Sequence, residues 1–391
     1  MATQKVSDTL IDSFPSSKLT GALPVIDGSA ITGAGDSVTK SASDPAIDTN
    51  PSGGVSHVWV NTTSGEVYSC TDATTDANIW TNVGSGDGDI APWNYGGSSY
   101  GFMVGAAGHQ SICKFTFASS TTATDFGDLA NNSAYTKSGH SDKDNSYGYH
   151  AGGYIAVSTI ERFSMVSQGT SSHVGDLTAV TDAAGSTNNN THAFTLGHGW
   201  DAGSGGVGTM VQKFAFASSA AASEHGSLAY NQYNSGSGNT NGDASYGYMM
   251  GGNAGGVGSP AGIAKMKEIQ KISLNSASTS TVIASTTLHR HSSAGSSSST
   301  HGYSSGGHNG GFIAVIDKFS FATEADATGV GDMASGAKHQ RAAASALDYG
   351  YNAGGGGDYQ GIDRINFSQD GNSVGVGNLS QGFTGPGAAQ V

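Results

Sequence analysis

Histidine is the residue type in this chain that most directly suggests site chemistry, because the sequence holds 13 of them. His289 and His291 are two residues apart, a spacing that puts both imidazoles on one face of a β-strand and suits a metal site. His301 and His308 follow closely, yet no cluster of carboxylates or cysteines completes a ligand set. We interpret these residues as polar loop histidines, of which His140 is another, and predict no metal and no cofactor.

Catalytic motifs are missing from the sequence. It contains no H-E-x-x-H pair and no phosphate-binding P-loop. The stretch 368–372 approaches the Asp box of sialidases but is one residue short and lacks the tryptophan. We predict that the protein is not an enzyme. A glycan hydrolase stays open as an alternative, because two carboxylates from distant segments can form such a site.

Sugar binding is the chemistry that the remaining candidates suit best. Trp200 is followed directly by Asp201. An exposed indole can stack on the apolar face of a sugar ring, while a carboxylate accepts hydrogen bonds from its hydroxyl groups. The predicted ligand-binding residues are Trp200, Asp201, Lys265, Lys267, His308 and Asn309.

The elements that would position these residues come from an internal repeat with a mean period of about 50 residues. Its first landmark is an alternating, strand-like hexapeptide with a cation at its third position. The six copies are Ile112–Phe117, Ile160–Met165, Val211–Phe216, Ile269–Leu274, Ile316–Phe321 and Ile362–Phe367. The cations are Lys114, Arg162, Lys213, Lys271, Lys318 and Arg364. A residue present in every copy is expected to be structural.

Two further landmarks keep a fixed order around the hexapeptide. A glycine-rich strand precedes it, as Y-G-Y-x-x-G-G in three of the six copies. A tripeptide of the Gly-Asp-Leu type, meaning Gly, any residue and then Leu or Met, follows twelve residues after the central position of the hexapeptide in five copies. We predict that Asp128, Asp176 and Asp332 hold this turn through side-chain to backbone hydrogen bonds. A pair between the repeat cation and this aspartate, such as Lys318 with Asp332, is a further hypothesis.

The repeat predicts an all-β fold. Each unit supplies three or four short strands, and no segment has a sustained helical period. Units of this size match propeller blades, and a closed ring lets each blade bury its faces against its neighbours. We predict a six-bladed β-propeller over residues 91–391, with a stacked β-solenoid as the alternative.

Loop lengths vary most between the glycine-rich strand and the hexapeptide. The third and fourth units carry long insertions there, over residues 198–210 and 253–267. In a propeller these lie side by side on one rim, where repeat proteins often bind partners. Drift in loop length explains the same insertions, so both interpretations stay open.

Residues 1–90 lack the repeat. We predict an attachment and oligomerisation segment with a small β module at about 55–84, built from a hairpin over 58–70 and a third strand at 79–83. A module of this size is marginally stable alone, which favours packing in an oligomer or a larger assembly.

The composition limits the classes of partner that the protein is expected to bind. Sixteen Lys and Arg against thirty Asp and Glu give a net charge of −14, which argues against nucleic-acid binding. No apolar run is long enough for membrane insertion, and the first residues lack the pattern of a signal peptide. Cys70 and Cys113 are expected to be free, buried thiols.

The repeats resemble kelch-type propellers through the glycine pair and the period, although almost no tryptophan is present in them. They are more similar to kelch-like repeats in structural proteins of tailed phages. The stretch 50–84 is similar to a module of phage tail-fibre and virion proteins, and 18–32 to linkers that precede it.

The phage resemblance implies a virion component, assembled in the host cytoplasm, that acts as a tail fibre or appendage. Residues 1–90 would bind other virion proteins, and the propeller would bind a host cell-surface glycan or receptor. A homo-oligomer is implied, with a trimer as the expected state of a fibre. The alternative within this resemblance is a decoration protein of the capsid or tail with a purely structural role.

Overall fold

The structure of the chain is a computed structural model that describes residues 38–83, 95–106, 108–131, 138–153, 157–181, 184–198, 208–217, 219–232, 234–253 and 266–391. It divides into two compact units, residues 1–92 and 93–391. Within the described residues every regular element is a β-strand, which confirms the all-β prediction. This part of the chain contains no helix that is long and apolar enough to cross a membrane.

The smaller unit is one four-stranded sheet. Its strands are β1 (Val38–Ser41), β2 (Val58–Asn61), β3 (Val67–Asp72) and β4 (Ile79–Asn82), in that order. The β2–β3 hairpin forms because the Asn61 side chain accepts hydrogen bonds from the N–H groups of Thr63 and Ser64 at 2.8 and 3.1 Å. Tyr68 and Trp80 form its buried face.

The described residues of the larger unit form six sheets, which are antiparallel except where the short strands β20 and β7 pair in parallel with β16 and β29. We number the sheets in chain order of their first strands. Sheet 1 has β9 (Gly139–Asp142), β10 (Tyr147–Gly153), β11 (Val157–Ser164) and β12 (Ser172–Asp176). Sheet 2 has β13 (Gly185–Asn188), β14 (His192–His198), β15 (Gly208–Ala215), β16 (Ser223–Gln232) and the short β20 (Ser278–Thr279). Sheet 3 has β17 (Asn234–Thr240), β18 (Tyr246–Asn253), β19 (Met266–Ser273) and β21 (Thr281–Ser285).

Sheets 4 and 5 follow the same plan. Sheet 4 has β22 (Ala294–Ser297), β23 (His301–Ser305), β24 (Val315–Ser320) and β25 (Thr328–Asp332). Sheet 5 has β26 (Ala342–Ser345), β27 (Tyr349–Ala353), β28 (Gly361–Asn366), β29 (Val374–Asn378) and the short β7 (Thr121–Thr122). The hexapeptide is the third strand of each sheet, and the glycine-rich segment is the second.

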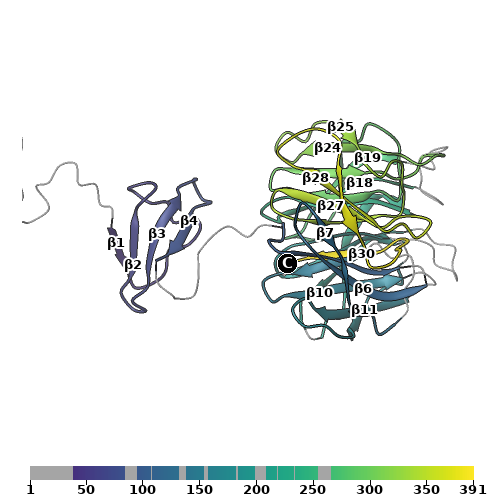
Figure 1. The fold of residues 1–391 in the computed structure, drawn as a ribbon. Coiled ribbons are helices and arrows are strands. Elements are labelled where there is room, and N and C mark those ends of the chain that lie inside the picture. Colours follow the sequence, from purple (N-terminus) through teal and green to yellow (C-terminus); the bar gives the residue numbers. More distant parts are fainter. Residues whose placement is uncertain are drawn as a thin grey trace, which may run out of the picture. The chain divides into compact units, whose positions relative to one another are not determined.

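Sheet 6 combines the two ends of the larger unit. Its strands are β30 (Gly387–Gln390), β5 (Tyr100–Ala106), β6 (His109–Thr116) and β8 (Thr124–Asp128). The last strand of the chain therefore pairs with the first strand of this unit, with Gly387 opposite Val104. Figure 1 shows β30, in yellow, among strands that precede it by more than two hundred residues.

The first strands of neighbouring sheets contact one another. The contacts run from β9 to β13, β17, β22, β26 and β30, and β30 contacts β9. These strands approach closely because small residues face each other. A Cβ at Gly139 would lie within 3.0 Å of the Ala388 backbone, and one at Gly238 within 3.0 Å of the Ser186 carbonyl oxygen.

Hydrogen bonds link corresponding positions of these first strands. The Thr240 N–H donates to Ser297 Oγ at 3.1 Å, Ser297 N–H to Ser345 Oγ at 2.9 Å, and Ser345 N–H to Gln390 Oε1 at 3.4 Å. The Gln390 N–H donates to Ser141 Oγ at 2.8 Å. Ser141 N–H donates to Asn188 Oδ1 at 3.4 Å, and the hydroxyls of Thr187 and Thr240 also bond. Edge-strand N–H groups that would otherwise be buried without partners are thus satisfied.

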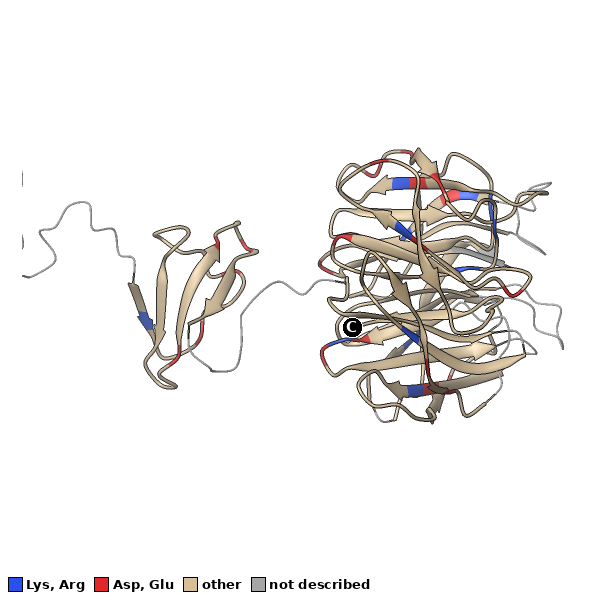
Figure 2. Cartoon of the chain, viewed as in Figure 1, with Lys and Arg blue, Asp and Glu red and all other residues tan. Residues whose placement is uncertain are grey.

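The repeat cations lie against the aromatic ring that begins the second strand. Lys114 Nζ is 3.9 Å from the centre of the Tyr100 ring, and the Arg162 guanidinium is 4.3 Å from that of Tyr147. Lys271 and Arg364 make the same contact. Figure 2 shows Lys and Arg within the strands of the larger unit, where such a structural role places them. Lys213 and Lys318 instead lie near His192 and His301, which occupy the position of the aromatic ring. Burial is the main cause of the lowered pKa of these two histidines, and the positive charge of the neighbouring lysine is the second cause.

The predicted pair of Lys318 with Asp332 is wrong. Lys318 Nζ instead binds Asp370 at 2.8 Å, a residue of the next sheet. The register explains this, because β24 places Lys318 opposite Thr328 and Val315 opposite Asp332.

The Gly-Asp-Leu aspartates end fourth strands instead of holding a turn, and the side chain of Asp176 accepts hydrogen bonds from Ser158 Oγ and His173 Nε2, both at 3.3 Å. Asp128 and Asp332 are exposed at the ends of β8 and β25.

The glycine of the Gly-Asp-Leu tripeptide is required by contact between sheets. At Gly331 an added Cβ would lie within 3.0 Å of the carbonyl oxygen of Gly371, in the next sheet. Gly127 and Gly175 lie against backbone of a neighbouring sheet in the same way, and Gly226 and Gly377 lie against the backbone of the short strands β20 and β7. The glycine of the tripeptide is therefore explained by the close packing of backbone segments at this position.

We predict that Gly331→Ala lowers the free energy of unfolding by about 2–4 kcal/mol, since backbone on both sides must move to admit one methyl group. Urea titration followed by circular dichroism measures this change. Gly311→Ala is the matched control, because open space surrounds Gly311. Equal stability of the two variants would contradict the packing described for Gly331.

Candidate functional site

Two sets of loops meet at one end of the six sheets. In a four-stranded antiparallel sheet, the loop between strands two and three lies at the same end as the start of strand one and the end of strand four. The crossovers from each fourth strand to the next first strand lie there too. We call this the crossover end. Hydrogen bonds join the two sets of loops, for example between the N–H of His291 and the carbonyl of His308 at 3.2 Å.

The predicted ligand-binding residues can be placed in part. Trp200, Asp201 and Lys265 lie outside the described residues. Lys267 is exposed near the start of β19, and His308 and Asn309 lie in the loop between β23 and β24. The three described candidates therefore all lie at the crossover end.

His308 belongs to a cluster of aromatic rings that could not be predicted from the sequence. Its ring centre is 5.2 Å from that of His291, 5.7 Å from Phe312 and 6.0 Å from His339. Phe312 and His339 are stacked, with centres 4.5 Å apart and planes at 12°. The other side of the His339 ring lies against Gly356, where a Cβ would overlap it.

A cation borders this cluster. Lys338 Nζ lies 4.7 Å from the centre of the Tyr359 ring, and its backbone carbonyl accepts a hydrogen bond from the N–H of Gly307, next to His308, at 2.8 Å. We call the surface formed by these residues the histidine patch. Its members are His291, His308, Phe312, Lys338, His339 and Tyr359.

Two buried ion pairs hold the crossovers that carry the patch. Arg290, next to His291, binds Asp317 of β24 at 2.7 Å, and both side chains are fully buried. Arg341, two residues after His339, binds Asp363 of β28 at 2.6 Å. Burial lowers the pKa of Arg290 and the neighbouring Asp317 opposes that shift. Arg290 also donates to the carbonyls of Ser304, Gly306 and Val315, at 2.9–3.2 Å.

Asp317 and Asp363 occupy one repeat position, directly after the first residue of the hexapeptide. The position is buried in all six sheets, where it carries Cys113, Glu161, Gln212, Gln270, Asp317 and Asp363. Each side chain bonds the crossover that arrives from the preceding sheet. Gln212 Oε1 accepts from the N–H of Ala179 at 2.9 Å, and Cys113 Sγ is 2.7 Å from Ser380 Oγ. A polar residue repeated at a strand position facing the core was the sequence signal for these anchors.

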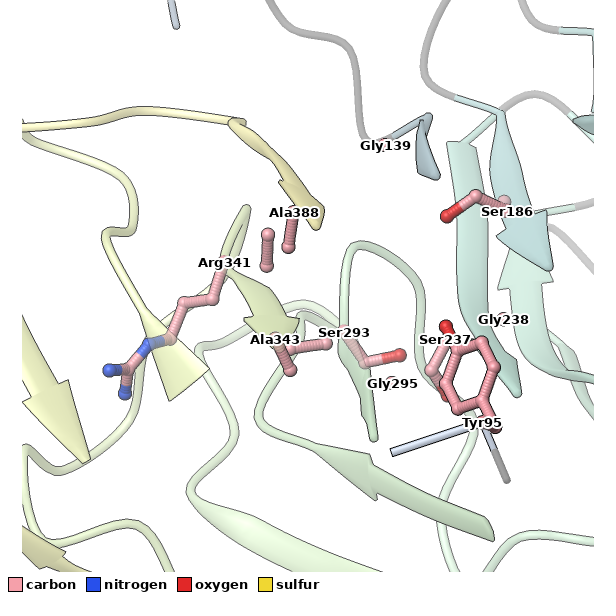
Figure 3. A pocket seen from close by; sticks show the side chains of 13 residues that line it. Tyr95, Gly139, Ser186, Ser237, Gly238, Ser293, Gly295, Arg341, Ala343 and Ala388 are labelled. Carbon is pink, nitrogen blue, oxygen red and sulfur yellow. The ribbon is translucent and has the colours of Figure 1, made fainter. Parts of the chain in front are cut away.

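The first strands surround a cavity of about 30 Å³, which is room for one water molecule. Figure 3 shows small residues of several sheets around it, with the Arg341 side chain directed away. This cavity is too small for a sugar. Tyr95 lies at the other end of the sheets from the histidine patch, where its carbonyl accepts a hydrogen bond from Gln390 Nε2 at 3.2 Å.

Metal binding and thiol chemistry find no support in the described part of the chain. No group of three or more His, Cys, Asp or Glu side chains is arranged there to hold a metal ion. Cys70 and Cys113 are both free and buried, as predicted. Burial is the main cause of the raised pKa of each thiol, which lowers its reactivity.

No protein-family model and no curated protein matches the chain.

We predict that Asp317→Asn lowers the free energy of unfolding by about 3–5 kcal/mol, because the Arg290 charge then stays buried without its counterion. Asp370→Asn is the matched control. Asp370 also pairs with a cation but is 60% exposed, and we expect a change of about 0–1 kcal/mol. Urea unfolding of both variants measures the difference. Similar losses would contradict a special role for the buried pair.

Proposed function

We propose that the six sheets of the larger unit are the blades of a closed six-bladed β-propeller. Sheets of four or five strands that follow one another in the chain support this proposal, as do the contacts that lead from β9 through the other first strands and back from β30 to β9. Pairing of the final strand with the first strand of the unit is a further support, since it joins the two ends of the unit in one sheet, as the closure of a propeller ring requires.

We propose further that the protein is a non-enzymatic binding module that recognises a saccharide at the crossover end. The observation that carries this is Phe312, whose side chain is 57% exposed although its ring is stacked on His339. An aromatic ring held rigidly at the surface can stack on a sugar face. The exposed Asn309 and the half-buried His308 supply polar groups beside it for hydroxyl contacts.

The context we propose is a phage virion, in which the chain forms a tail fibre or appendage that binds a host-surface glycan. This proposal rests on the resemblance of the repeats and of stretch 50–84 to phage structural proteins. Two observations support it. The smaller unit has its own core, which suits an attachment module. The first described residues of the larger unit, 95–99, bond the far ends of the first strands, opposite the patch.

Binding of the purified chain to a glycan array tests this function. We predict that at least one glycan is bound, and that Phe312→Ala weakens binding at least tenfold because the stacking surface is lost. Val166→Ala is the matched control, since Val166 is apolar and 73% exposed but lies in sheet 1 outside the patch.

Other outcomes separate the alternatives. Release of shorter products from a bound polysaccharide would favour the glycan hydrolase. The absence of binding to any glycan and to host cells would favour the decoration protein and contradict the proposed function. Binding that Phe312→Ala leaves unchanged would contradict the assignment of the site.

A further inference from the structure

We propose that the histidine patch recognises an acidic saccharide, with the anionic group at His308 and Lys338 and the sugar ring against Phe312. This inference rests on the proposed function and deepens it, because it names the charge class of the ligand. It uses the local charge of the patch, which differs from that of the whole chain.

Charge at the patch is unlike the net charge of −14 of the chain. The patch contains three imidazoles and the ammonium group of Lys338, and His289 is exposed next to Arg290. Two of the nearby carboxylates, Asp317 and Asp363, are buried in ion pairs and offer no free charge at the surface. An anion at the patch therefore meets donors and cations.

Other charged groups of the surrounding elements are few. Asp358, in the loop between β27 and β28, accepts a hydrogen bond from Thr384 Oγ1 at 2.9 Å. Glu268 lies at the start of β19, where it accepts from the N–H of Lys267 at 3.0 Å. Asp332, exposed at the end of β25, is a third carboxylate at this end, against the two cations Lys267 and Lys338. The preference for an anion therefore depends on the imidazoles.

The arrangement of the rings favours a saccharide over a small free anion. Phe312 is the exposed member, and its centre is 5.7 Å from that of His308. A pyranose that carries a carboxylate or sulfate presents an apolar face and an anionic edge at a similar separation. The Lys338 ammonium is held over Tyr359, so the cation is partly ordered before the ligand arrives.

Protonation provides a signature that a purely structural patch would not give. Imidazole side chains as a class carry more positive charge at lower pH, whereas sugar carboxylates stay ionised at pH 5.5. An anion therefore binds more tightly at the lower pH, and the dependence requires the imidazoles.

Affinity measurements by biolayer interferometry, with immobilised alginate, dextran sulfate and neutral dextran as probes, test the proposal. We expect alginate or dextran sulfate to bind at least tenfold more tightly than dextran, and at least fivefold more tightly at pH 5.5 than at pH 7.5. Alginate alone would identify a carboxylate, and dextran sulfate alone a sulfate. Either result supports the proposal.

Variants assign the effect to the patch. His308→Ala should weaken binding of the acidic probe about fivefold at pH 5.5 and flatten the pH dependence. Lys338→Ala should weaken it at both pH values. His173→Ala is the matched control, because His173 is an exposed histidine of β12 outside the patch. Circular dichroism and thermal melting confirm that each variant is folded.

Three results would overturn the inference. Binding of dextran as tight as that of the acidic probes removes the charge preference and leaves the proposed saccharide binding intact. Acidic binding that His308→Ala and Lys338→Ala do not change places the site elsewhere. No binding of any probe overturns the inference, and it overturns the proposed function as well if the glycan array is also negative.

Discussion

Close contact among the six first strands is the constraint on which the larger unit depends. Each first strand is a sheet edge, and an edge buried against its neighbours must still satisfy its N–H groups. Serine, threonine, asparagine and glutamine near the ends of these strands accept those protons, as Ser345 does for Ser297 and Gln390 does for Ser345. Glycine at 139 and 238 removes the side chains that would hold the strands apart. At these positions glycine is required because backbones meet.

The same packing explains how the candidate site is held. Crossovers leave each fourth strand, pass over the end of the next sheet and enter its first strand. A buried polar side chain on the third strand, such as Gln212 or Asp317, fixes each crossover from below. In sheets 4 and 5 this side chain is an aspartate paired with an arginine of the crossover itself. The histidine patch lies on these two crossovers and the adjoining loops, so rigid sheets position its rings.

Much of the fold could be predicted from the sequence because each repeated residue has a structural cause that is the same in every sheet. The second glycine-rich position is small because an aromatic ring of the third strand covers it, as Phe163 covers Gly148. The site could be predicted only in part. Periodicity brings His308 and Asn309 to one end of the sheets, but it does not reveal that His291 and His339, 48 residues apart in the sequence, lie on either side of His308. The Lys318 pair was missed because strand register decides which acid a repeat cation reaches.

Closure by the last strand is the central claim, and amide hydrogen exchange tests it most directly. The N–H groups of Ser141, Thr240, Ser297 and Ser345 donate to side chains of neighbouring sheets, and we predict that they exchange slowly in the full chain. In a chain that ends at residue 386, and so lacks β30, all four should lose protection, including Thr240 and Ser297, whose strands β17 and β22 are not neighbours of the deleted strand. If Thr240 and Ser297 keep their protection in the shortened chain, the sheets are stable independently and the account of a closed ring is contradicted.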